Sequence, residues 1–158
     1  VVLSVFSAGQ TTTGTVTVET NIQGSMTRHL VEWVSSDKGN VIYSGLTTVG
    51  YLRHVEILSA GNSSTGVDTA DTPTTAYDVE VLNDMRRDLL AGAGADIATT
   101  STGNTQTAPK VVIPTIDDGE TTAVVTDVAA SHGALTLNVT NAGDTRKGWI
   151  ALYFDSYR

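Results

Sequence analysis

Three histidines are the side chains in this sequence that are best suited to acid–base chemistry or to metal binding. His29 falls on the same predicted strand face as Val31, and His54 falls on a face of a second predicted strand over residues 52–58. His132 precedes a glycine in a predicted turn. Residues far apart in sequence can converge on one site, but neither an HxH nor an HExxH spacing is present. We therefore interpret all three as strand or turn histidines without a metal or catalytic role.

Acidic residues in turn-like segments raise the question of a calcium site. Calcium takes about six to eight oxygen ligands, often from loop carboxylates and carbonyls. The run Asp117, Asp118, Gly119 and Glu120 is the strongest candidate, but the EF-hand pattern is absent. A solvated hairpin turn is the better interpretation, so we expect no metal and no cofactor. The other acidic residues of this kind are Asp68, Asp71 and Asp78.

Motifs for nucleophilic catalysis and for phosphate binding are absent from the sequence. No GxSxG nucleophile elbow occurs, and Gly92 and Gly94 lack the Lys-Ser/Thr of a phosphate-binding loop. The basic pair Arg86 and Arg87 is flanked by aspartates, which favours a salt-bridged turn over an anion site. We therefore predict that the protein is not an enzyme, and we assign no catalytic or cofactor-binding residue.

The composition narrows the class of protein. Charged residues make up only 16% of the 158 residues, against about 25% in typical soluble domains, and the formal net charge is −8. This acidic balance argues against nucleic acid and against an anionic membrane surface as partners. The absence of cysteine excludes disulfides and thiolate metal sites. No apolar run approaches about 18 residues, and the start VVLSVF lacks the features of a secretory signal, so neither a membrane span nor a signal is expected.

Short runs of alternating or β-branched residues, separated by turn residues, predict an all-β fold. We expect one antiparallel β-sandwich, jelly-roll-like, over residues 15–158, preceded by an arm of residues 1–14. The best helical candidate, residues 83–91, supports a short helical turn at most. The predicted strands cover residues 15–19, 28–35, 40–43, 51–58, 76–82, 110–113, 121–125, 134–140 and 147–154.

The last predicted strand is apolar on both faces. Trp149 and Tyr153 alternate with Ile150 and Leu152, so one face can meet the core while the other must meet a second layer, a loop or another subunit. A covered interior position is the favoured interpretation, and a subunit interface is the alternative. The apolar start of the chain is a second candidate interface, because it belongs to an arm that could dock on a neighbouring subunit. The candidate interface residues are Val1, Val2, Leu3, Val5, Phe6, Trp149 and Tyr153.

Three segments together resemble a family of virion proteins of tailed bacteriophages and prophages. They are PTTAYDVEVLND at 73–84, DLLAGAGA at 88–95 and GALTLNVTNAGDTRKGWIALYF at 133–154. In that family a Pro-Thr-x-x-Tyr-Asp-Val strand leads to an Asp-Leu-Leu-x-Gly turn, and a closing hairpin follows. The resemblance covers roughly the C-terminal half, and the chain departs from it at residues 85–87, where members usually have a more acidic, glycine-containing turn.

The resemblance implies a small β-rich structural protein of the virion. From this resemblance we expect a capsid decoration (cement) protein that lies on the capsid surface. Its expected partners are the major capsid protein and further copies of itself, with which it forms a homotrimer. A tail, baseplate or head-fibre component is the first alternative. A carbohydrate-binding module that attaches the particle to a host is the second alternative, from a different class of function.

Overall fold

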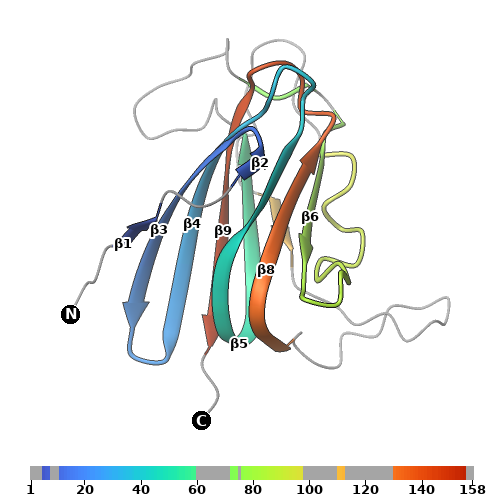
Figure 1. Ribbon diagram of the computed structural model, residues 1–158. Coiled ribbons are helices and arrows are strands. Elements are labelled where there is room, and N and C mark those ends of the chain that lie inside the picture. The colour runs from blue at the N-terminus through green and yellow to red at the C-terminus, as the bar shows by residue number, and fades with distance from the viewer. Residues whose placement is uncertain are drawn as a thin grey trace, which may run out of the picture.

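The computed structural model describes residues 5–7, 11–59, 72–74, 76–97, 110–112 and 130–155. Within these ranges all regular structure is β, so the predicted all-β class is confirmed (Figure 1). The strands pair antiparallel in one hydrogen-bonded sheet of order β1-β3-β4-β9-β5-β8-β6, and β2 and β7 also pair with β5. Their bounds are β1 Val5–Ser7, β2 Thr11–Thr13, β3 Thr15–Gln23, β4 Met26–Val34, β5 Val41–Ser59, β6 Asp78–Leu82, β7 Lys110–Val112, β8 Ala130–Thr140 and β9 Lys147–Asp155.

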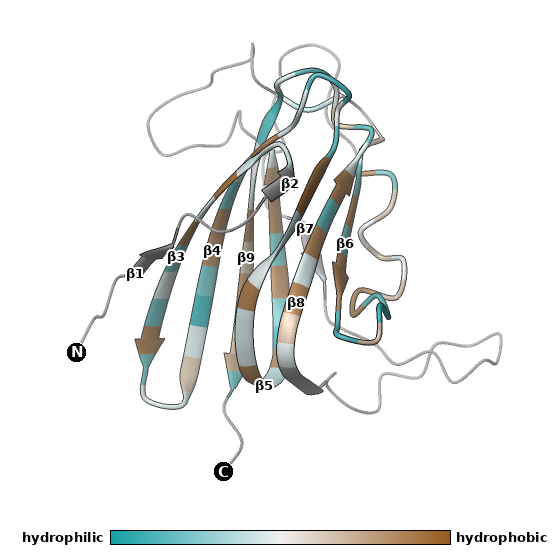
Figure 2. Cartoon of the chain, in the orientation of Figure 1, coloured by the Kyte–Doolittle hydropathy of each residue, from teal (hydrophilic) through white to brown (hydrophobic). Residues whose placement is uncertain are grey.

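The hairpin of β3 and β4 shows how the alternation in the sequence produces one buried face. Val18 pairs with Val31 and Val16 pairs with Trp33, and all four side chains are buried. The residues between them are half-buried or exposed, and the hydropathy colours alternate along both strands (Figure 2). The two-residue loop begins with Gly24 at a φ of 60°, a backbone conformation that favours glycine. Period-two burial therefore fixes which face of this hairpin meets the core.

β5 corrects the prediction of two separate strands at 40–43 and 51–58, because it runs without a break over 19 residues. Its first part pairs with β8 and its second part pairs with β9, and Tyr51 has partners in both, Ala130 and Asp155. β8 pairs with β5 on both sides of Gly45, and Gly50 is itself paired with Ser131, so neither glycine ends the strand. Register shifts between Tyr43 and Leu46, and between Leu52 and His54, mark irregularities of the bulge type.

β4 and the segment before β6, which are far apart in the strand order, face each other across one core. Trp33 on β4 and Tyr77, just before β6, have ring centroids 5.8 Å apart, although their strands are not neighbours in the sheet. Burial raises the pKa of Tyr77 to about 12, against a smaller opposing effect of the nearby Ser59. The sheet thus folds over on itself, while the finer expectation of a jelly-roll-like sandwich stays a prediction.

β6 and β8 lie side by side in the sheet. Alternation along the predicted strands at 76–82 and 134–140 predicts that Val79 and Val81 pack against Leu137 and Val139 across the core of a sandwich. The structure instead pairs Val79 with Val139 and Val81 with Leu137 as cross-strand neighbours, and all four are buried. The predicted contacts therefore exist, but they are lateral contacts on one face.

The segment after β6 covers the free edge of that strand with turns, and residues 83–91, the best helical candidate of the sequence, form turns and no helix. Asn83 Oδ1 accepts the backbone N–H groups of Met85 and Arg87. Asp88 Oδ1 accepts those of Val81 and Leu90. Pairing an exposed edge with local chain prevents it from recruiting a foreign strand.

The predicted N-terminal arm is described only in part. In β1, Val5 pairs with Thr20 and Phe6 pairs with Glu19, and β2 joins β5 through Thr11 and Tyr43. These two segments are hydrogen-bonded to the sheet. Val1, Val2 and Leu3 lie outside the described residues, and the role of the arm as an anchor stays a prediction.

Gly148 is the position where β9 passes the largest side chain of the core. A Cβ added there would come within 2.7 Å of Cε2 of Trp33 and 3.1 Å of the carbonyl oxygen of Leu58. Neither neighbour can retreat easily, because the Trp33 side chain is fully buried and the carbonyl belongs to the sheet. The indole and the glycine are therefore a matched pair.

We expect Gly148→Ala to lower the free energy of unfolding by about 1–3 kcal/mol through overpacking. In a Trp33→Leu background the same change should cost less, with a coupling of about 0.5–3 kcal/mol between the two sites. Urea denaturation of the wild type, both single variants and the double variant measures this coupling. Equal costs of Gly148→Ala in the two backgrounds would show that Trp33 is not the obstacle.

Candidate interface on the outer face of the sheet

Trp149 and Tyr153 lie half-buried on the side of the sheet that points away from the core. We call the side chains of β3, β4, β9 and the second part of β5 on this side the outer face. Ile150, Leu152 and Phe154, on the other side of β9, are fully buried. The strand is therefore apolar on both faces, as predicted, and only its inner face belongs to the core.

Tyr153 is the centre of a polar and aromatic cluster on the outer face. The ring of His54 stacks on it with centroids 4.0 Å apart and an interplanar angle of 18°. The Tyr153 hydroxyl donates to Glu56 Oε2 at 3.2 Å, and Arg28 interacts with the same tyrosine from β4. Desolvation raises the pKa of Tyr153, and the charge of Glu56 raises it further. The phenol thus stays a neutral donor, held between two neighbouring strands.

His54 reaches this cluster because of an irregularity in β5. Simple alternation predicts that His54 shares a face with Leu52. The register shift between Leu52 and His54 places both Arg53 and His54 outside, whereas Leu52 and Val55 are buried. Arg53 in turn forms an ion pair with Asp155 at 3.0 Å. The extra residue therefore brings His54 to the outer face beside Arg53, which simple alternation already places there.

Trp149 lies beside an apolar strip in the middle of the outer face. It pairs with Glu32 on β4 and with Leu58 on β5, and the next outward residue, Ala151, pairs with Leu30. The Nζ of Lys147 lies 5.5 Å from the Trp149 ring centroid and 2.6 Å from Glu32 Oε1. Glu56 pairs with Ala151 from the β5 side. The strip, made of Leu30, Leu58, Trp149 and Ala151, thus has Lys147 and Glu32 on one side and Glu56 on the other.

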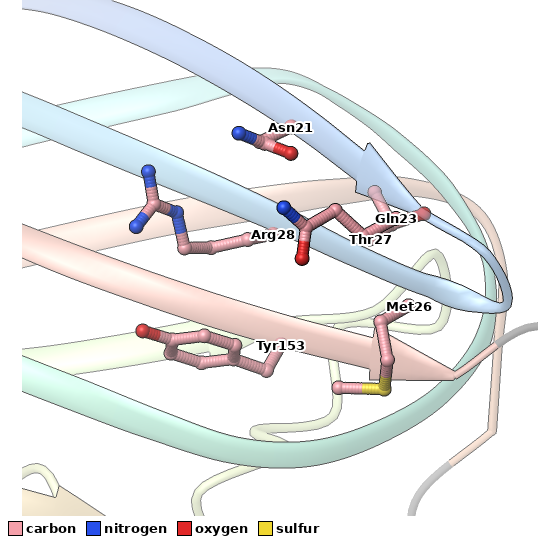
Figure 3. A pocket seen from close by; sticks show the side chains of 6 residues that line it. All are labelled: Asn21, Gln23, Met26, Thr27, Arg28 and Tyr153. Atoms are coloured by element: carbon pink, nitrogen blue, oxygen red, sulfur yellow. The ribbon is translucent and has the colours of Figure 1, made fainter. Parts of the chain in front are cut away.

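A hollow of about 270 Å³ opens beside Tyr153 at the end of β3 and β4 (Figure 3). Asn21 and Gln23 on β3 and Met26 and Arg28 on β4 lie on the same face as Tyr153 by the pairing register. Thr27 also lines the hollow. Met26 is among the exposed large hydrophobic residues, at 38% exposure. The hollow thus combines two amides, one guanidinium, one thioether and one aromatic ring.

The structure places the remaining predicted site residues as follows. His132 lies in β8, paired with Val49, which corrects the predicted turn. Val5 and Phe6 are in β1, away from Trp149 and Tyr153 in the strand order. The acidic run at 117–120 lies outside the described residues. Within the described ranges, no group of three His, Asp or Glu side chains is placed to hold a metal ion.

Sequence reasoning named Trp149 and Tyr153 as candidates but did not reveal the residues that surround them. Arg28, His54 and Glu56 reach Tyr153 from two other strands, and Glu56 is 97 residues away in sequence. One indication of these neighbours was present in the sequence: alternation along a predicted strand places Arg28, Leu30 and Glu32 together on the face that points away from the core. Alternation alone does not reveal which other strand pairs with this one.

Comparisons with known proteins leave the site without a named relative: no family model, no curated protein and no solved structure matches this chain. Among the described residues, no helix has the length and apolar character needed to cross a membrane. The outer face presents stacked aromatic rings, ion pairs and an apolar strip with a charged rim, and these features can contact another surface.

His29 is buried on the inner face beside Val31, as predicted. It is 5% exposed, its Nδ1 lies 2.8 Å from Thr20 Oγ1, and its ring meets Phe154 edge-on at 5.7 Å. Nε2 has no hydrogen-bond partner among the described residues. Burial therefore lowers the pKa of His29 below its ordinary value of 6.5.

This burial predicts a pH dependence of stability. On acidification through pH 6.5 the unfolded chain takes up a proton at His29 before the folded chain does, so the free energy of unfolding falls as pH drops from 6.5 toward the lower folded pKa. His29→Gln should flatten the profile between pH 6.5 and about 5, above the range of most carboxylates. His54→Gln, at a half-exposed histidine of the same sheet, is the matched control. An unchanged profile in His29→Gln would show that another group is responsible.

Proposed function

We propose that this protein is a structural protein of a tailed-bacteriophage virion, acting as a capsid decoration protein that bridges capsid subunits. The observation that carries the proposal is the apolar strip around Trp149 with charged side chains on both sides. An apolar centre with a polar rim is the usual anatomy of a protein interface. The sequence resemblance at 73–84, 88–95 and 133–154 supplies the virion context.

The outer face suits a mechanical role because neighbouring strands hold its side chains in place. Lys147 bridges Glu32 and Trp149, and Tyr153 is held by His54 and Glu56. A preordered surface loses less side-chain entropy on association than a mobile one. Repetition around a shell would multiply such contacts through avidity. A tail, baseplate or head-fibre position is the alternative, since a similar surface would serve there.

Copy number per particle separates the two positions. We expect quantitative mass spectrometry of purified virions to give a copy number comparable with that of the major capsid protein, and a particle density map to place the chain on the head. A few copies per particle would move the protein to the tail. Absence from the particle would overturn the virion assignment altogether.

We also propose that the chain forms a homotrimer, with Trp149 in the contact between copies or with the shell. Light scattering of the isolated protein, and of the protein bound to particles, measures the assembly state. A monomer mass in solution together with isolated, non-trimeric density on the particle would contradict the trimer.

Trp149→Ala should weaken attachment by at least about 2 kcal/mol, the size typical of an interfacial tryptophan anchor. The fold should persist, because Trp149 is only half-buried and lies outside the core. Occupancy on isolated particles, measured beside a melting curve, tests this. Met85→Ala is the matched control, since Met85 is 84% exposed and lies in the turn after β6, away from the outer face. Equal occupancy of the two variants would remove Trp149 from the interface.

A further inference from the structure

The hollow beside Tyr153 has the size of a small-ligand site. Its volume of about 270 Å³ lies just under the range of about 300–1,000 Å³ typical of pockets for drug-sized molecules. It opens at the ends of β3 and β4, and Figure 3 shows its lining residues rising from β3, β4 and β9. Three strands of a paired sheet hold these residues, so the hollow is formed before any ligand arrives.

The lining combines ring and amide chemistry. His54 stacks on Tyr153, and this stack supports the phenol from the β5 side while the hollow borders the phenol on the β4 side. The amides of Asn21 and Gln23 each offer donors and an acceptor, and Arg28 offers donors only. Such a set suits a ligand that has an apolar C–H face and many hydroxyl groups around its edge.

The charges near the hollow favour a neutral ligand. Arg28 lies 4.0 Å from Glu19, and Arg53 pairs with Asp155 at 3.0 Å. Glu56 adds one more carboxylate, which receives the Tyr153 hydroxyl. The two guanidinium groups are thus matched by carboxylates, and the chain as a whole carries a net charge of −8. An anionic sugar or a phosphate would meet repulsion that a neutral molecule avoids.

We propose that this hollow binds one neutral hexopyranose unit of a glycan, with a C–H face of the sugar on Tyr153 and hydroxyl groups on Asn21, Gln23 and Arg28. The site is compatible with the interface proposed above, because Trp149 is four residues away along β9, about 13 Å. The inference goes beyond the virion role, and each proposal can fail without the other.

Nuclear magnetic resonance titration of the isotope-labelled protein tests the site directly. The probes are glucose, galactose, mannose and N-acetylglucosamine, with glucuronic acid as the charged comparison. We expect at least one neutral sugar to shift the side-chain amide signals of Asn21 and Gln23 in a saturable way, with a dissociation constant of about 1–10 mM. No saturable shift with any of the neutral sugars at about ten times that range, or binding of glucuronic acid alone, would overturn the proposal.

Substitutions distinguish a role of the Tyr153 ring in sugar binding from an effect on folding. Tyr153→Ala and Asn21→Ala should each weaken sugar binding by about tenfold or more, whereas Tyr153→Phe, which keeps the ring, should lose less. Tyr51→Ala is the matched control, because Tyr51 is a tyrosine on the same face that does not line the hollow. Trp149→Ala should leave sugar binding unchanged, even where it abolishes assembly. Undiminished binding in both Tyr153→Ala and Asn21→Ala, with spectra that show a folded chain, would place the sugar elsewhere.

Discussion

Backbone hydrogen bonding along β5 is the interaction on which the rest of the described structure depends. This strand pairs with four others, β2, β7, β8 and β9, and it passes from β8 to β9 at Tyr51. A sheet that twists strongly along one long strand brings its two ends toward each other. The register cannot slip by one residue, because Val41, Tyr43, Val55 and Ile57 would then leave the core for water.

The folded-over sheet encloses a core in which β4, β9 and the residue before β6 approach one another closely. Trp33 meets Tyr77 across the core and covers the backbone of β9 at Gly148. A large side chain opposite a glycine is a shape match that area burial alone does not provide. Trp33 and Gly148 are cross-strand partners, so the glycine leaves room for the indole on the inner face of β9.

The charged and aromatic side chains lie on the outer face because apolar side chains of the core occupy the inner face. Burying the ion pairs of Arg53 with Asp155 and of Lys147 with Glu32 would require desolvation of all four charged groups. Half-exposed, they stay partly hydrated and orient the aromatic side chains between them. The same face thus offers an apolar strip around Trp149 and a polar hollow beside Tyr153, two surfaces with different chemistry on one strand.

Local patterns in the chain are enough to predict the all-β class, most strand positions and the buried faces that carry Val31, Trp33, Ile150 and Leu152, because period-two alternation involves only neighbouring residues. They also predict the turn at Asn83, whose side chain bonds to nearby backbone. Only the tertiary structure decided that β5 is one strand, that His132 lies in β8 rather than in a turn, that β6 and β8 are lateral neighbours, and that Arg28, His54 and Glu56 surround Tyr153. The physical reason is that these outcomes depend on which strands pair and where a bulge shifts the register, and the hydrogen bonds responsible join residues that are distant along the chain.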